Sequence, residues 1–367
     1  MTAIRPEVRL SCVVMAHPNR RERAERLCGQ LRELSARVVY DAWPDGPRSA
    51  ARAALAAWSA TPPWATHHMV LQDDVALCPD FARRVRAVLS AMSDRTISLF
   101  AEWGSVTATM VRWGALTGAG LVACVDGYVP TQAVVFPVGT LPALLADAEH
   151  AVRRQERDDD IVLANHLGSR GTFAYVTVPN LVEHIDEGSI MRHESMGRRR
   201  AACPPQVDDP WITPTVLAAP AWVPTQTWSK GRAVCQRIGA GGSLPTRRLL
   251  AEIGIGPAAI TAELDRQLAM LLPMADLELD IGYALLHELW FTGVALGVWM
   301  PGDARPNDPI AVRALNTLPW GALRCFVVES VLARDSAALQ VFCRLALEQG
   351  IELKGKVNGG IPRDRNV

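Results

Sequence analysis

The sequence has no excess of charge of either sign. Its 367 residues include 38 lysines and arginines against 38 aspartates and glutamates, so the formal net charge at pH 7 is zero. Proteins that bind long nucleic acids neutralise phosphates with a basic patch, which normally shows as an excess of positive charge. We therefore expect no nucleic-acid polymer among the partners of this protein.

Long uninterrupted apolar runs and paired cysteines are also missing. The longest apolar stretch, residues 281–300, carries His287 and Glu288 near its middle, and we interpret it as a buried helix because charges within a membrane are costly. Residues 1–10 contain no apolar segment typical of an export signal. The eight cysteines form no CxxC pair. Together these absences predict a cytoplasmic protein with free thiols and no transmembrane segment.

Two common phosphate and metal motifs are absent as well. No GxxxxGKS/T motif occurs, which excludes a P-loop. The glycine-rich residues 239–242 follow no clear strand and are interpreted as a turn, and His287-Glu288 lacks the second histidine of a zinc-binding helix. Any nucleotide or metal site must therefore be built in another way.

The first half of the chain does contain an alternation of strand-like and helix-like segments. Short apolar runs predict strands at residues 9–16, 37–40, 68–72, 96–101, 121–125, 131–136 and 173–178. Helical spacing predicts helices at residues 20–34, 49–59, 79–92, 141–154 and 158–167. This alternation is typical of an α/β fold with a parallel sheet covered by helices.

The second half has a different character. Six prolines fall within residues 204–224, and proline continues neither a helix nor a central strand. We therefore predict a domain over residues 1–203, a Pro/Trp-rich linker over 204–228 and a mainly helical accessory domain over 229–367. Helices are expected at residues 249–272, 275–299, 311–324 and 337–349.

The paired carboxylates of Asp73 and Asp74 are the sharpest local signal. They follow an apolar strand, and ligands of open α/β sheets bind at the carboxyl ends of the strands. Adjacent carboxylates repel each other unless a cation compensates, and a divalent metal held there can bind a diphosphate. The alternative is a surface turn with two solvated acids.

Residues 8–195 resemble metal-dependent glycosyltransferases of the GT-A fold. Four parts carry the resemblance, in the order of the family. They are a polar loop after the first strand (residues 15–20, MAHPNR), an acid after the second (38–41, VVYD), a DxD-like element (71–75, LQDDV), and an acidic helix start (158–163, DDDIVL) followed by a strand end (178–184, VPNLVEH). The element QDDV departs from a plain D-x-D, which leaves open which aspartate binds directly and whether a metal is required.

The resemblance implies a Rossmann-type mixed sheet with helices on both faces, together with a bound metal and its ligands. Asp74 would be the main carboxylate on Mn²⁺ or Mg²⁺, and Asp73 would reach the metal through water or contact the ribose. His184 would be a third ligand, since an imidazole is acceptable to Mn²⁺. Its alternative role is a hydrogen-bonded histidine at a strand end.

The resemblance also implies a nucleotide pocket. His17, Pro18, Arg20 and Asp41 would surround the base and ribose, where an acid can accept from hydroxyl and N–H groups. Asp45 is a looser candidate for the same pocket. The alternative for Arg20 is a solvated residue in the first turn of a helix.

The acidic helix start is the candidate for catalysis. Transfer with inversion needs a carboxylate that takes the proton of the acceptor hydroxyl. Asp159 or Asp160 fits by position, and we favour Asp159. The alternative is helix capping by acids, which the helix dipole favours. An enzyme that retains configuration needs no such base.

The function expected from the resemblance is transfer of a sugar from a nucleoside diphosphate donor, UDP-sugar first, to a hydroxyl-bearing small molecule, glycan or peptide. The helical C-terminal domain would set acceptor choice, homo-oligomerisation or both, and the Ala- and Arg-rich composition suggests a bacterium. One alternative is a nucleotidyltransferase, although the loop at 17–20 lacks the expected glycine. The other is a non-catalytic scaffold that binds a nucleotide sugar.

Overall fold

The computed structural model describes residues 7–185, 197–270 and 272–356. The chain forms two compact units. Unit 1 consists of Met1–Ala101, Ala119–Arg192 and Pro204–Leu217, and unit 2 of Glu102–Gly118, His193–Cys203 and Ala218–Val367. The chain thus passes repeatedly between the units, which differs from the predicted boundaries at residues 203 and 228.

An eight-stranded mixed sheet forms the centre of unit 1, so the chain is an α/β protein. The strand order is β10-β6-β8-β5-β7-β3-β1-β2. These strands are β1 (Leu10–Ala16), β2 (Arg37–Tyr40), β3 (His67–Gln72), β5 (Ile97–Ser98), β6 (Leu121–Ala123), β7 (Ala133–Pro137), β8 (Tyr175–Thr177) and β10 (Val216–Leu217). β1 runs parallel to β2 and β3, whereas β7 runs antiparallel between β3 and β5.

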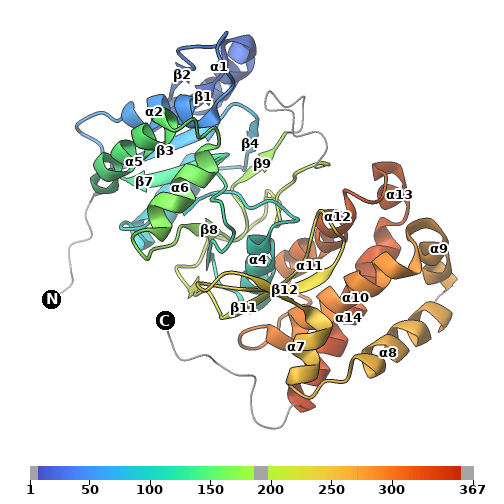
Figure 1. The fold of residues 1–367 in the computed structure, drawn as a ribbon. Coiled ribbons are helices and arrows are strands. Elements are labelled where there is room, and N and C mark those ends of the chain that lie inside the picture. The colour runs from blue at the N-terminus through green and yellow to red at the C-terminus, as the bar shows by residue number, and fades with distance from the viewer. Residues whose placement is uncertain (1–6, 186–196, 271, 357–367) are drawn as a thin grey trace. The chain divides into compact units, whose positions relative to one another are not determined.

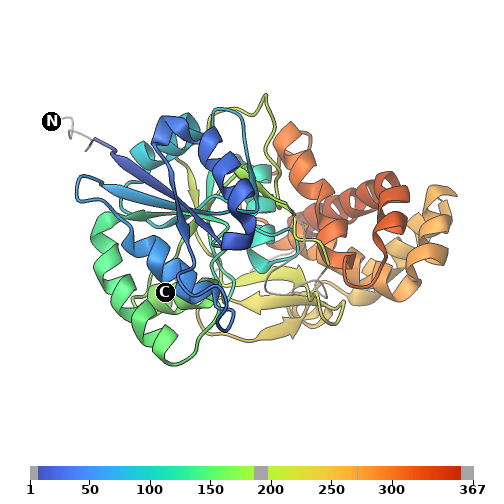
Figure 2. The ribbon, with the colours of Figure 1, turned by 90° about the horizontal axis from the view of Figure 1, so that it is seen from above.

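Helices cover both faces of the sheet around β1. All seven residues of β1 are buried, as an apolar strand between two neighbours requires. β2 and β3 flank β1 on opposite sides, so right-handed crossovers put the intervening helices α1 (Arg21–Gln30) and α2 (Ala50–Ser59) on opposite faces. α2 packs with α5 (Leu141–Arg153) and α6 (Asp159–Gly168), as Figures 1 and 2 show.

A two-stranded ribbon extends unit 1 beside the end of β3. β4 (Val75–Leu77) leaves the turn that contains Asp73 and Asp74 and pairs antiparallel with β9 (Val182–His184). Helix α3 (Phe81–Ala91) follows β4. This ribbon brings residues more than a hundred positions apart to the same turn.

Unit 2 combines helices with a small antiparallel sheet of β11 (Trp222–Gln226), β12 (Ala233–Arg237) and β13 (Ser243–Pro245). Its longer helices are α4 (Val106–Thr117), α7 (Thr246–Glu252), α8 (Pro257–Met270), α9 (Leu272–Ile281), α10 (Tyr283–Trp299), α11 (Pro309–Asn316) and α14 (Ser336–Lys356), with the short α12 (Leu318–Leu323) and α13 (Glu329–Arg334) between the last two. α10 and α14 approach closely at Gly350, where a Cβ would lie only 2.1 Å from the carbonyl oxygen of Val294.

The apolar run at 281–300 is a buried helix, as predicted. α10 begins after Gly282, whose φ of 91° separates it from α9 and divides the helix expected over 275–299. The Glu288 carboxylate inside it accepts from Arg232, Arg247 and the Ala233 backbone N–H. No helix among the described residues is long and apolar enough to cross a membrane.

Residues 204–228, predicted as a linker, are part of both units. β10 pairs with β6 in unit 1, and Arg84 of α3 donates to the carbonyl oxygens of Asp209 and Pro210. β11 belongs to unit 2 and contains Pro224. Pro224 is tolerated because β11 lies at the edge of its sheet, where a missing N–H need not cost a ladder bond.

Candidate functional site

Three neighbouring parallel strands of unit 1 end almost level with one another. The register pairs Ala16 at the end of β1 with Tyr40 at the end of β2, and β3 ends beside them at Gln72. The residues that follow are His17 after β1, Asp41 after β2, and Asp73 and Asp74 after β3. The strand ends in this part of the sheet therefore gather the predicted polar residues at one edge, the usual ligand-binding edge of open α/β sheets.

The guanidinium of Arg20 lies between the two aspartates. Its Nη1 donates to Asp73 Oδ1 at 2.9 Å and to Asp74 Oδ2 at 3.2 Å. The side chains are 16%, 5% and 17% exposed for Arg20, Asp73 and Asp74. Adjacent carboxylates with so little contact with water need a compensating cation, and Arg20 supplies it. Arg20 thus lies at the aspartate pair, and the alternative of a solvated helix residue is wrong.

His184 reaches the same pair from the ribbon. Val75 pairs with His184 in the β4–β9 register, and the Ile185 N–H donates to the Asp74 carbonyl oxygen at 2.8 Å. His184 Nε2 lies 3.6 Å from Asp74 Oδ2, and its side chain is 5% exposed. The ribbon therefore brings together the two residues that the resemblance implied as metal ligands.

The two aspartates have opposite electrostatic environments. Burial alone would raise the pKa of Asp74, but the His184 imidazole and the Arg20 guanidinium outweigh it and hold that pKa below its usual value. Burial and the neighbouring Asp74 raise the pKa of Asp73 despite the bond from Arg20. Asp74 is therefore the more firmly ionised of the pair and the better ligand for a cation.

The chemistry of this cluster fits a divalent cation. Asp74 Oδ1 is buried and accepts no hydrogen bond within the described residues, and a buried acceptor without a donor is costly. No group of three or more His, Cys, Asp or Glu side chains suited to a metal occurs among those residues. Two protein ligands nevertheless suffice for such an ion when substrate phosphates supply the other positions. Asp74 and His184 would be those two ligands.

Replacing Arg20 with methionine should destabilise the protein most at neutral pH. Loss of the guanidinium leaves two ionised, poorly hydrated carboxylates without compensation, which should lower the free energy of unfolding by about 1–3 kcal/mol. The penalty requires ionised carboxylates, so it should shrink as the pH is lowered, with Asp73, whose pKa is raised, protonating before Asp74. Urea denaturation at pH 7.5 and pH 5 measures both values.

Arg26→Met is the matched control for this experiment, because Arg26 is 69% exposed and pairs with Glu22 at only 3.8 Å. It should change the free energy of unfolding by less than about 0.5 kcal/mol. An Arg20→Met penalty of the same size at both pH values would contradict the assigned role of Arg20.

The acid after β2 holds a loop together. Asp41 accepts from Arg52 Nε at 3.1 Å, from Arg52 Nη2 at 2.7 Å and from the Trp43 N–H at 3.1 Å. Burial would raise the pKa of Asp41, but Arg52 and Trp43 hold it below its usual value. Most of its acceptor capacity is therefore used within the protein. Asp41 therefore has little capacity left for the predicted contact with the ribose or base. Its bonds hold the loop that follows it.

His17 joins that loop to the turn that carries Arg20. Its Nδ1 accepts from the Asn19 N–H at 3.2 Å, and its Nε2 lies 3.3 Å from the Pro44 carbonyl oxygen. These partners assign the proton to Nε2, because a carbonyl can only accept. Pro18 begins the short helix η1 (Pro18–Arg20) that His17 caps. His17 and Pro18 therefore shape this edge of the sheet.

Asp159 lies buried at the start of α6 and is linked to the end of β3. The Thr131 hydroxyl bonds to the Asp159 carboxylate and accepts from Gln72 Nε2 at 3.2 Å, next to Asp73. Burial raises the pKa of Asp159 to about 6, although the bond from Thr131 opposes the rise. A buried carboxylate that titrates near neutrality beside a polar strand edge has the properties of a general base.

The remaining candidates are less enclosed. Asp160 is half-buried, and its carboxylate accepts from the Ile161 N–H at 2.7 Å. Asp45 is exposed in the loop after β2. Asp158 makes no side-chain capping bond, but the carboxylates of Asp159 and Asp160 accept from N–H groups of the first helical turn, as the capping alternative expects. Asp159 is the most buried of the three acids.

Sequence reasoning missed three contributors to this edge. The roles of Thr131 and Gln72 become visible only when β7 is paired with β3, where the Gln72 N–H donates to the Gln132 carbonyl oxygen. The position of Trp43, two residues after the strand-end acid Asp41, could have indicated an aromatic side chain near the site. Its exposure of 57% could not be read from the sequence.

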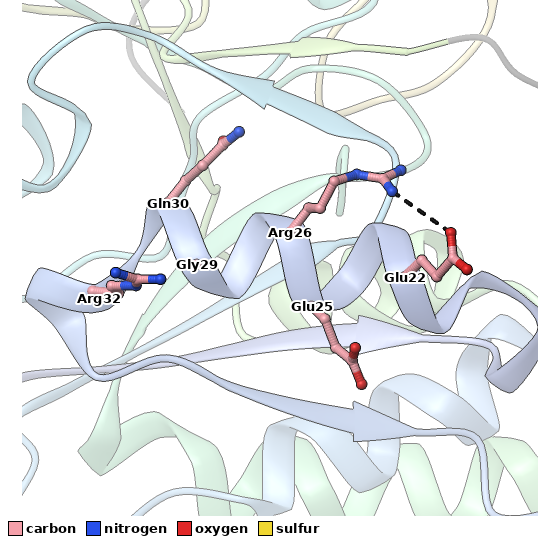
Figure 3. A pocket seen from close by; sticks show the side chains of 6 residues that line it. All are labelled: Glu22, Glu25, Arg26, Gly29, Gln30 and Arg32. Carbon is pink, nitrogen blue, oxygen red and sulfur yellow. Dashed lines mark ion pairs between the residues drawn. The ribbon is translucent and has the colours of Figure 1, made fainter.

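A hollow outside this site lies along α1 and is lined by Glu22, Glu25, Arg26, Gly29, Gln30 and Arg32 (Figure 3). Its charged groups are exposed ion pairs at helical spacing, such as Arg26 with Glu22. This is a solvated helix face, and it offers no buried polar group that could direct a reaction.

Neither a scan against models of protein families nor a search of curated proteins gives a match to this chain. The function is therefore argued from the site itself.

Proposed function

We propose that the protein is a glycosyltransferase of the GT-A class that moves a sugar from a nucleoside diphosphate to a hydroxyl acceptor. The observation that carries the proposal is the cluster of Arg20, Asp73, Asp74 and His184 at the carboxyl edge of a mixed α/β sheet. It combines a cation, an ionised carboxylate with an unused buried oxygen, and an imidazole. A carboxylate and an imidazole can bind a divalent cation, and the oxygens of a diphosphate can complete its ligands.

Each residue of the cluster has a role in binding the donor. Asp74 and His184 would hold Mn²⁺ or Mg²⁺, and Asp73 would contact the metal through water or the ribose. The metal, when bound, would neutralise charge that develops on the leaving diphosphate. Arg20 supplies a positive charge beside the same oxygens and suits the diphosphate, because a guanidinium binds phosphate groups through several donors.

Asp159 supports an inverting reaction. The acceptor oxygen would attack the anomeric carbon of the sugar while the bond from that carbon to the diphosphate oxygen breaks. The acceptor proton would move to the Asp159 carboxylate, and the nucleoside diphosphate would leave with the bonding electrons. A pKa of about 6 keeps Asp159 largely ionised at pH 7.5 and basic enough to take the proton.

A thermal-shift screen with UDP, GDP, CDP, ADP and dTDP, each with and without Mn²⁺, tests the proposal without knowledge of the acceptor. A ligand that binds only the folded state raises its melting temperature by mass action. We expect one nucleotide, UDP first, to raise the melting temperature in the presence of Mn²⁺, and Asp74→Asn to remove that shift. The absence of a shift with all five nucleotides would contradict the proposal and favour a protein with another ligand.

A further inference from the structure

We propose that the indole ring of Trp43 is the surface on which the nucleotide base stacks. This inference rests on the proposed function and adds the residue that binds the base. The ring is 57% exposed, although tryptophan is among the side chains that gain most from burial. Its surroundings hold it rigidly in that exposed position.

Three hydrogen bonds fix the backbone of Trp43. Its N–H donates to Asp41 Oδ1 at 3.1 Å, and its carbonyl oxygen accepts from Arg52 Nη2 at 3.1 Å and from the Gly46 N–H at 3.1 Å. Asp41 and Arg52 are also joined to each other by two bonds. The strand-end acid and the helix α2 arginine therefore set the position of this one residue.

The ring itself contacts Arg52 of helix α2 and Gly46 of the loop. The Arg52 guanidinium carbon lies 5.4 Å from the ring centroid, in the range of a cation–π contact. A Cβ at Gly46 would lie 2.3 Å from the ring carbon Cδ2, so only glycine leaves room for the indole there. An aromatic ring held in this way loses little freedom when a ligand stacks on it, which favours affinity.

The loop is tied to the turn that carries the diphosphate residues. The Pro44 carbonyl oxygen lies 3.3 Å from His17 Nε2, and the His17 carbonyl oxygen accepts from the Arg20 N–H at 2.8 Å. Pro44, which follows Trp43, and the backbone of Arg20 thus both contact His17. A nucleotide with its diphosphate at Arg20 and Asp74 would direct its base toward Trp43.

Stacking accounts for affinity without choosing among the bases, because every base has a π-face. We therefore expect Trp43 to contribute to binding of whichever nucleoside diphosphate the protein accepts.

The test measures the dissociation constant of UDP, GDP, CDP, ADP and dTDP by isothermal titration with Mn²⁺ present. Trp43→Ala should raise the dissociation constant of the nucleotide that binds by about tenfold, as loss of a base–aromatic stack does. Trp43→Phe, which keeps an aromatic face, should stay within about threefold of the wild type. Trp64→Ala is the matched control, because Trp64 is 51% exposed in the same unit but lies before the amino end of β3, whereas Asp73 and Asp74 follow its carboxyl end. It should bind like the wild type.

Two results would overturn the inference in distinguishable ways. If the wild type binds a nucleotide and Trp43→Ala binds it equally well, the base lies elsewhere and the proposed function is unaffected. If the wild type binds none of the five nucleotides, the proposed function and this inference both fail.

Discussion

Replacing Asp74 with asparagine should reduce transfer of the sugar by about a thousandfold or more. The amide lacks the charge that holds a divalent cation, and loss of metal stabilisation of a leaving diphosphate costs several kcal/mol, with tenfold in rate for each ~1.4 kcal/mol. Release of nucleoside diphosphate from the nucleotide sugar, with water as acceptor, measures the rate. In the same variant, Mn²⁺ should no longer increase the affinity for the nucleotide.

Asp80→Asn is the control for this variant. Asp80 lies six residues further along, is exposed, and has a φ of 53°, a left-handed conformation that asparagine tolerates well. It should retain the wild-type rate. Retention of Mn²⁺-dependent activity by Asp74→Asn would show that the carboxylate of Asp74 is not the metal ligand.

Asp159→Asn should lower kcat by about 10²–10⁴-fold, the usual contribution of a general base. The wild-type rate should fall as the pH drops through about 6, because burial raises the pKa of Asp159 to about 6 and only the ionised form accepts a proton. The variant should lose this pH dependence. Asp160→Asn, at the half-buried neighbouring position, should change kcat by less than about threefold and keep the wild-type pH profile.

Stability provides a second measurement for Asp159. A group whose pKa is raised in the folded state destabilises it when ionised, and this cost is present above the folded pKa and absent below the unfolded one. Asp159→Asn should therefore raise the free energy of unfolding at pH 8, by at most about 3 kcal/mol, and have little effect at pH 4. An unchanged pH–rate profile in Asp159→Asn would mean that another group is the base, or that configuration is retained and no base is needed.

The sequence predicted the sheet of unit 1 well where strands and helices alternate regularly. The strands expected at 37–40 and 68–72 correspond to β2 and β3, and the helix at 49–59 to α2. Helix α4 was missed because ten of its twelve residues are buried, so its sequence lacks the polar face that marks a surface helix. The same helix belongs to unit 2, which is why the predicted domain boundary at 203 differs from the structure.

The site could be predicted only in part. A carboxylate pair after an apolar strand was visible in the sequence, and its proximity to His184 followed from a resemblance. The bond from Arg20 to Asp73 joins residues 53 positions apart. Arg52 and Asp41 bond to each other, but from the sequence each could have paired with several other charged residues. Charge pairing of this kind depends on strand register and side-chain direction, which residue spacing does not determine.

Crystallography can show whether Asp74 and His184 hold a metal together with a nucleoside diphosphate. Crystals of the full chain grown with Mn²⁺ and the nucleotide found by the thermal-shift screen allow the metal to be located by anomalous scattering. We expect a manganese peak bonded to the Asp74 carboxylate and the His184 imidazole, with the diphosphate on the same ion and beside Arg20. A nucleotide bound away from these residues, or bound here with no manganese peak, would contradict it.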